Sequence, residues 1–222
     1  MSKLQPLDNS KLKPFQFFFK AVHESMGFVP NSLKTMARVP GIMGAFSILS
    51  GSLLGDPKNA NPIIFLKLFF KQLGWTSRLM NDPNRIPLSL RHMVSYVTSR
   101  AAGCIYCQAH TFASALQGEV DENKMKNIWT FEDSDLFSES EKSALRFGIA
   151  AGSAPNAVTE EHFTDLREHF NENQIVELGA VISLFGFLNR WNDTFATQLE
   201  SEPIATANSF LKDEGWLIGK HA

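Results

Sequence analysis

Apolar residues recur along the chain at the three- and four-residue spacing of an amphipathic helix. Alternating runs of Val, Ile or Thr are few, and the Asn-Gly and Asp-Gly pairs that favour β-hairpin turns do not occur. We therefore predict an all-α fold. Helices are expected over about residues 14–26, 31–38, 41–54, 63–80, 89–102, 104–116, part of 121–139, a stretch after 138, 159–170 and 173–199, with a docked tail after 203.

Glycine separates the two helices in the middle of the chain. The first is expected from a Ser89 cap through Ala102 and ends at Gly103, and the second begins at Cys104 and closes at Gly118. Both cysteines of the chain, Cys104 and Cys107, therefore fall in the first turn of a helix. Backbone N–H groups and the helix dipole favour thiolate over thiol at this position.

Composition narrows the class of protein. The chain has 222 residues, 44% apolar and 20% charged, as is usual for a globular protein. Its net charge of -2 and isoelectric point near 6.3 argue against nucleic acid as a partner. The longest apolar stretch, 62–73, contains two lysines and is too short to span a membrane. The first residues lack a secretory signal, so we expect a cytoplasmic protein without a membrane partner.

The spacing of the two cysteines suits redox chemistry. A thiolate can attack the O–O bond of a hydroperoxide, and a second nearby thiol then resolves the sulfenic acid to a disulfide. His110 follows Cys107 by three residues, so on a helix the two share a face and the imidazole could carry a proton. Two simpler interpretations stay open: a cysteine pair without function, and a zinc site. Structural zinc usually takes four ligands and the chain has no second cysteine pair, so we expect neither metal nor cofactor.

Four segments of the chain resemble the carboxymuconolactone decarboxylase superfamily, in its alkylhydroperoxidase D-like, peroxidase-related branch. They are residues 28–33 (FVPNSL), 37–41 (ARVPG), 97–111 (VTSRAAGCIYCQAHT) and 187–190 (FLNR), and the cysteine segment is the specific one. The resemblance implies an all-helical fold, a homo-oligomer such as a trimer or hexamer, and reduction of hydroperoxides with a thiol reductant. It also implies that Cys107 is the peroxidatic cysteine and Cys104 the resolving one.

The resemblance departs from the family pattern at two positions. The family's proton relay has a glutamate twelve residues before the first cysteine, where this chain has His92. It has a histidine four residues after the second cysteine, where this chain has Thr111, and His110 stands one place earlier. His92 is thus a candidate replacement in the relay, or an ordinary structural histidine. The segment 56–87 also looks longer than the family's usual connection.

A weak internal echo bears on the domain organisation. Five residues recur eighty-three positions later, namely Gly103, Thr111, Phe112, Ala113 and Leu116 as Gly186, Thr194, Phe195, Ala196 and Leu199. We expect a single all-α domain over 1–222, with the cysteine pair in about 1–118 and a second helical half over about 135–200.

Three functions are compatible with these observations. The leading hypothesis is a thiol-dependent peroxidase acting on organic hydroperoxides through Cys104 and Cys107. The superfamily also includes lactone and decarboxylation chemistry, which would not need two cysteines. A non-enzymatic helical oligomer that senses redox state is the third; it would react slowly with peroxide and show no lowered cysteine pKa.

Overall fold

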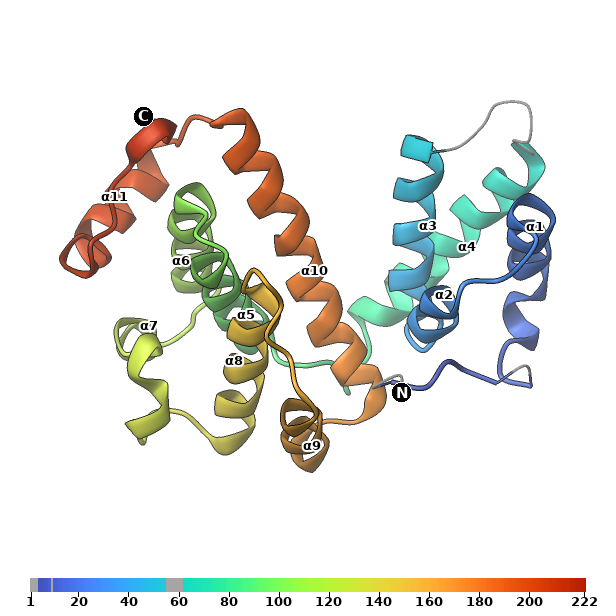
Figure 1. The fold of residues 1–222 in the computed structure, drawn as a ribbon, viewed down its shortest axis with the longest axis horizontal. Coiled ribbons are helices and arrows are strands. Elements are labelled where there is room, and N and C mark those ends of the chain that lie inside the picture. The colour runs from blue at the N-terminus through green and yellow to red at the C-terminus, as the bar shows by residue number, and fades with distance from the viewer. Residues whose placement is uncertain (1–3, 9, 55–61) are drawn as a thin grey trace. The chain divides into compact units, whose positions relative to one another are not determined.

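The computed structural model describes residues 4–8, 10–54 and 62–222, and within them it contains helices and turns but no strand (Figure 1). The prediction of an all-α fold is confirmed. By contacts between Cα atoms the chain divides into two compact units. Unit 1 comprises Met1–Arg85 with Glu172–Glu177, and unit 2 comprises Ile86–Asn171 with Leu178–Ala222.

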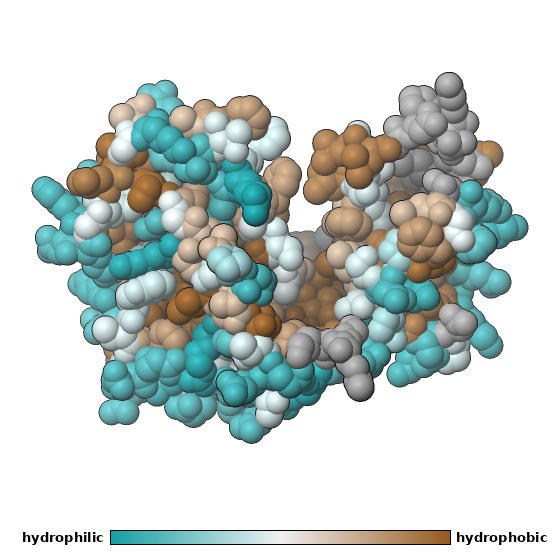
Figure 2. Space-filling view, in the orientation of Figure 1, coloured by the Kyte–Doolittle hydropathy of each residue, from teal (hydrophilic) through white to brown (hydrophobic). Residues whose placement is uncertain are grey.

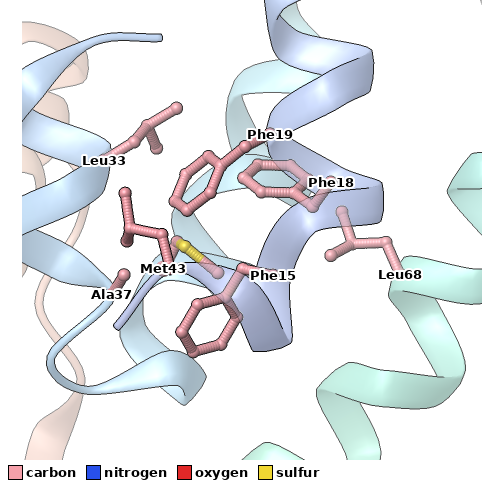
Figure 3. Close-up of a cluster of buried hydrophobic side chains, with 8 residues drawn as sticks. Phe15, Phe18, Phe19, Leu33, Ala37, Met43 and Leu68 are labelled. Atoms are coloured by element: carbon pink, nitrogen blue, oxygen red, sulfur yellow. The ribbon is translucent and has the colours of Figure 1, made fainter. Parts of the chain in front are cut away.

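Unit 1 is built around phenylalanine side chains. Its helices are η1 (Lys13–Phe15), α1 (Gln16–Met26), α2 (Asn31–Met36), α3 (Pro40–Leu54) and α4 (Pro62–Met80). Phe15, Phe18 and Phe19 point from η1 and α1 toward Leu33 and Met43, and burial of these rings forms the core of the unit (Figure 3). Other apolar side chains stay at the surface, where brown atoms gather around the end of α3 (Figure 2).

Unit 2 holds the cysteines. Its helices are α5 (Leu88–Ala101), α6 (Ile105–Gln117), α7 (Glu122–Lys126), η2 (Ile128–Asp133), α8 (Glu139–Gly152), α9 (Glu160–His169), the greater part of α10 (Glu172–Phe195), α11 (Ser201–Phe210), η3 (Lys212–Glu214) and η4 (Gly219–His221). Helix α5 packs against both α6 and α8, and α11 packs against α6. Met93, Val94 and Val97 are fully buried on α5, as the apolar spacing of this segment predicts.

Glycine makes the turn between α5 and α6 possible. Gly103 has φ +76°, a left-handed conformation that side chains disfavour, and it directly follows the C-cap of α5. The Cys104 N–H then donates to the Ser99 carbonyl at 3.1 Å, which ties the start of α6 to the end of α5. This turn fixes both cysteines at the beginning of α6.

Several boundaries differ from the predicted ones. The expected docked tail after Pro203 begins within a helix, because Ser201–Phe210 form α11, while Trp216 does contact α6. Proline fits there because it lies in the first turn, where backbone N–H groups have no helical partner. Helix α10 ends at Phe195 rather than near 199, and Ala196 follows with φ +47°. The predicted helix break at 55–57 lies outside the described residues.

The two segments of the internal sequence echo, around Gly103 and Gly186, differ in backbone conformation. Gly103 lies between two helices with a positive φ, whereas Gly186 lies inside α10. The division between the two compact units also falls at Arg85 rather than after residue 118. The organisation as one domain with two related halves stays a prediction. Among the described residues, no helix combines the length and hydrophobicity that crossing a bilayer would require.

Candidate functional site

The two cysteines meet at the start of α6. Cys104 is the N-cap residue, and its sulfur accepts a hydrogen bond from the Cys107 backbone N–H at 3.2 Å. Both thiols are free, and the two residues are only 1% and 3% exposed in the isolated chain. The Trp216 indole Nε1–H donates to the Ile105 carbonyl at 3.2 Å, so the C-terminal segment lies against the same first turn.

The pKa values of the two thiols shift in opposite directions. A hydrogen bond from the Cys107 thiol lowers the pKa of Cys104, and the Cys107 backbone N–H adds to this against the opposing effect of burial. The same interaction raises the pKa of Cys107 strongly, with burial as the second cause. Cys104 is therefore the more acidic thiol of the pair.

Helix α10 contributes a further contact that the sequence analysis missed. The Asn192 side-chain Nδ2–H donates to the Cys107 sulfur over 3.6 Å, and Asn192 is buried. This bond favours a thiolate at Cys107. Its neighbour Asp193 pairs with Lys220 at 2.8 Å. The segment 187–190 lies just before Asn192 in the sequence, but spacing alone gave no reason to place it beside a cysteine.

His110 is held by a carboxylate rather than by a cysteine. Its Nε2 lies 2.6 Å from Glu200 Oε2, and its ring stacks on Tyr106 with 4.4 Å between the ring centroids. The Tyr106 hydroxyl donates to Glu200 Oε1 at 3.2 Å. Burial is the largest single effect and would raise the pKa of Glu200, but the hydrogen bonds from His110, the backbone and Tyr106 together with the charge of His110 lower the pKa overall. Burial and the nearby Glu200 charge raise the pKa of Tyr106 to about 12.

His92 is not brought to the cysteines. It lies on α5, and a Cβ added to Gly118 would come within 2.6 Å of His92 Nε2, so the imidazole sits at the far end of α6. Eleven residues of helix between Cys107 and Gly118 correspond to about 16 Å along the axis. Burial, and then the charge of Arg91, lower the pKa of His92. The structure therefore gives His92 a packing contact and no direct access to the sulfurs.

One cluster in unit 2 has ligand atoms close enough to hold a metal. Asp165, Glu168 and His169 on α9 bring such atoms within 4.8 Å of one another, and two of the three residues are exposed. Asp165 already pairs with Arg146 at 3.1 Å. Neither cysteine belongs to this cluster, so the described residues place no additional ligand beside the pair for the zinc alternative.

The comparison with known sequences points to one family. Residues 67–150 match the model of the carboxymuconolactone decarboxylase family, and this range includes both cysteines. The uncharacterized protein YnjA of Escherichia coli (strain K12) is 29% identical over 133 residues, which are 59% of this chain and 70% of YnjA. The uncharacterized protein YdfG of Bacillus subtilis (strain 168) is 29% identical over 104 residues, 46% of this chain and 68% of YdfG.

Solved structures extend the match to nearly the whole chain. The debrominase Bmp8 is 28% identical and covers 95% of this chain and 98% of its own, with a TM-score of 0.56. A protein of unknown function from Agrobacterium tumefaciens that carries the name AhpD shares the fold, with 19% identity, a TM-score of 0.50, and coverage of 60% of this chain and 91% of its own. The chain therefore has an AhpD-like fold, and its residues 67–150 match the carboxymuconolactone decarboxylase family.

Proposed function

We propose that this protein is a dithiol oxidoreductase that reduces organic hydroperoxides with Cys104 and Cys107. The observation that carries the proposal is the sulfur pair at the start of α6, where Cys107 hydrogen-bonds to the Cys104 sulfur and lowers its pKa. The lowered pKa favours a thiolate at Cys104, which can accept the proton of Cys107 and so produce the nucleophilic thiolate form of Cys107. The match of residues 67–150 to the carboxymuconolactone decarboxylase family supports enzymatic activity of a peroxidase-like or decarboxylase-like kind.

The proposed cycle begins with a proton transfer inside the pair. The Cys107 proton moves to the Cys104 sulfur, and the hydrogen bond from Asn192 stabilises the new Cys107 thiolate. That thiolate attacks the terminal oxygen of the hydroperoxide, the O–O bond breaks, and the alkoxide leaves with a proton from His110. Cys107 is then a sulfenic acid and the substrate has become an alcohol.

The second half of the cycle restores the thiols. The Cys104 sulfur attacks the Cys107 sulfenic acid, a disulfide forms, and hydroxide leaves as water with the proton from Cys104. Two external thiols then reduce the disulfide and are themselves oxidised to a disulfide. Both cysteines are buried, so we expect a large thiol carrier to react only after the segment around Trp216 moves.

A peroxide pulse tests the cycle directly. The reduced protein should consume cumene hydroperoxide and accumulate an intramolecular Cys104–Cys107 disulfide, detected by mass spectrometry of peptides. Cys104→Ser should consume one equivalent and leave a sulfenic acid that dimedone traps on Cys107, while Cys107→Ser should consume none by this route. Unchanged peroxide consumption by Cys107→Ser would refute the assignment of Cys107.

A second candidate function follows from the debrominase match. Bmp8 covers 95% of this chain, and a cysteine-to-alanine variant of Bmp8 was solved with 2,3,4-tribromopyrrole, at 28% identity and a TM-score of 0.57 to this chain. The same dithiol could remove bromine: a thiolate takes the bromine atom, the ring carbon gains a proton, and the second thiol displaces bromide to form the disulfide. Bromide release from 2,3,4-tribromopyrrole, matched one for one by disulfide, would favour this substrate class over hydroperoxides.

The remaining alternatives differ from the two proposed reductions in whether they need the cysteines and in whether they turn over. A lactone hydrolysis or decarboxylation would survive in the Cys104→Ser, Cys107→Ser double variant, whereas a dithiol cycle would not. A redox sensor would form the same disulfide but without turnover when a thiol reductant is supplied. Product formation over many equivalents of substrate therefore distinguishes an enzyme from a sensor.

A further inference from the structure

The carboxylate of Glu200 is turned away from its own helix. Glu200 is the N-cap residue of α11, a position where an acidic side chain usually accepts a hydrogen bond from the first turn. Its side chain makes no such capping bond. Instead it reaches α6, where it lies 2.6 Å from His110 Nε2 and 3.2 Å from the Tyr106 hydroxyl.

This contact fixes the tautomer and the plane of the imidazole. An ionised carboxylate only accepts hydrogen bonds, so His110 Nε2 must carry the hydrogen in this pair. Nδ1 is then the ring nitrogen available to exchange a proton with the reacting atoms. Stacking on Tyr106, at an interplanar angle of 24°, holds the ring orientation from the other side. The arrangement corresponds to the acid-and-imidazole pairs in which the carboxylate orients the base and stabilises the imidazolium.

We propose that Glu200 is a positioning residue that orients His110 as the proton donor to the leaving alkoxide. The inference rests on the proposed peroxidase cycle. The role assigned is that of the carboxylate that orients the histidine, and the sequence around the cysteines offers no acidic residue for it. Glu200 directly precedes α11 as its N-cap residue, yet its carboxylate contacts the imidazole that shares a helix with Cys107. It is thus the carboxylate that the structure provides beside His110.

A purely structural role is a weak explanation of the pair. The side chains of His110 and Glu200 are 35% and 58% exposed, and exposed ion pairs contribute little to folding stability. The absence of a capping bond also means that replacing Glu200 removes no such support from α11. Glu200→Gln should therefore fold normally, which leaves its effect on chemistry measurable.

Leaving-group dependence tests the role of Glu200. An alkoxide is strongly basic and needs a proton when it departs, whereas the carboxylate that leaves peracetic acid does not. Glu200→Gln should slow oxidation of the protein by cumene hydroperoxide about 10–100-fold, since general acid catalysis contributes roughly 10²–10⁴-fold. Its rate with peracetic acid should stay within about 3-fold of the unmodified protein, because that step needs little of the same proton transfer.

Two controls separate this effect from a structural one. Glu202→Gln removes the same charge from the exposed first turn of α11 and should leave both peroxide rates unchanged. Alkylation of the cysteines by iodoacetamide, whose iodide leaves without a proton, should be equally fast in Glu200→Gln and the unmodified protein. A Glu200→Gln variant that slows both peroxides equally, or neither, overturns the proposal. If the unmodified protein oxidises with neither peroxide, the peroxidase function itself fails, which is a different result.

Discussion

The hydrogen bond between the two thiols lowers the pKa of Cys104 and raises that of Cys107. Replacing Cys107 should therefore raise the pKa of Cys104, and replacing Cys104 should lower the pKa of Cys107. Cys107→Ala removes the thiol that donates to the Cys104 sulfur and keeps the backbone N–H that donates at 3.2 Å. A hydrogen bond to a charged group is worth about 1.5–3 kcal/mol, and one pKa unit corresponds to about 1.4 kcal/mol. The pKa of Cys104 should therefore rise by about 1–2 pH units, because Cys104 is buried and water replaces the lost donor poorly.

The reverse variant should have the reverse effect. The pKa of Cys107 is raised first by its bond to Cys104, so Cys104→Ala removes the main cause and the pKa of Cys107 should fall. Cys107→Ser is the matched control, since its hydroxyl can still donate to the Cys104 sulfur and should preserve most of the lowered pKa. These three variants separate loss of the donor from loss of side-chain volume.

The assay is the pH dependence of alkylation by iodoacetamide, with the modified cysteine identified by peptide mass spectrometry and thiolate absorbance as a second readout. Below the pKa, a rise of about 1–2 pH units lowers the thiolate fraction roughly 10–100-fold, and the alkylation rate of Cys104 in Cys107→Ala should fall with it. Equal apparent pKa values for Cys104 in Cys107→Ala and Cys107→Ser would show that the thiol is not the donor. The explanation of the lowered pKa of Cys104 would then be wrong.

Three other predictions concern stability and assembly. Gly152→Ala should lower the free energy of unfolding by about 1–3 kcal/mol, because the new Cβ would lie 2.8 Å from the Thr98 carbonyl oxygen. Gly186→Ala, with no atom within 4 Å of the new Cβ, should instead raise it by about 0.5–1 kcal/mol in urea unfolding; equal changes would contradict the packing argument. The pKa of Tyr106 is raised to about 12, so its contribution to stability is present below about pH 10 and is lost as the pH rises toward 12. The free energy of unfolding of Tyr106→Phe should therefore fall less between about pH 10 and 12 than that of the unmodified protein. The half-exposed Trp191 belongs to an apolar face of α10. If the expected homo-oligomer uses that face, Trp191→Glu should reduce the molecular mass measured by light scattering. An unchanged mass would place the interface elsewhere.

Local signals in the sequence were enough to locate the cysteine pair. Gly103 before Cys104 predicted both a helix end and a helix start, and the backbone has φ +76° at that glycine. The capping box at Ser138 and Glu141 likewise placed the start of α8 correctly. These features depend on residues within one or two turns of each other, so the chain itself contains the information needed to recognise them.

The partners of the pair could not be found in the same way. Asn192 and Glu200 lie far along the chain from Cys107 and His110, and only the packing of α10 and α11 brings them close. From the sequence, the residues after 203 were expected to form a docked tail rather than a helix. Pro203 instead occupies the first turn of α11, where it breaks no helical hydrogen bond, and the position of Glu200 follows from that helix.

The displaced histidine shows how one position on a helix can change the partner of a relay. Thr111 stands where the family pattern has its histidine. Its hydroxyl donates a hydrogen bond to the Cys107 carbonyl at 2.6 Å, so its proton is directed to the helix backbone and not to the sulfurs. His110 is one residue earlier, which turns its side chain by about 100° around α6. At that angle it meets Glu200 from α11. The acid beside the imidazole therefore comes from outside the cysteine motif, whereas His92, at the glutamate's position in the family pattern, packs against Gly118.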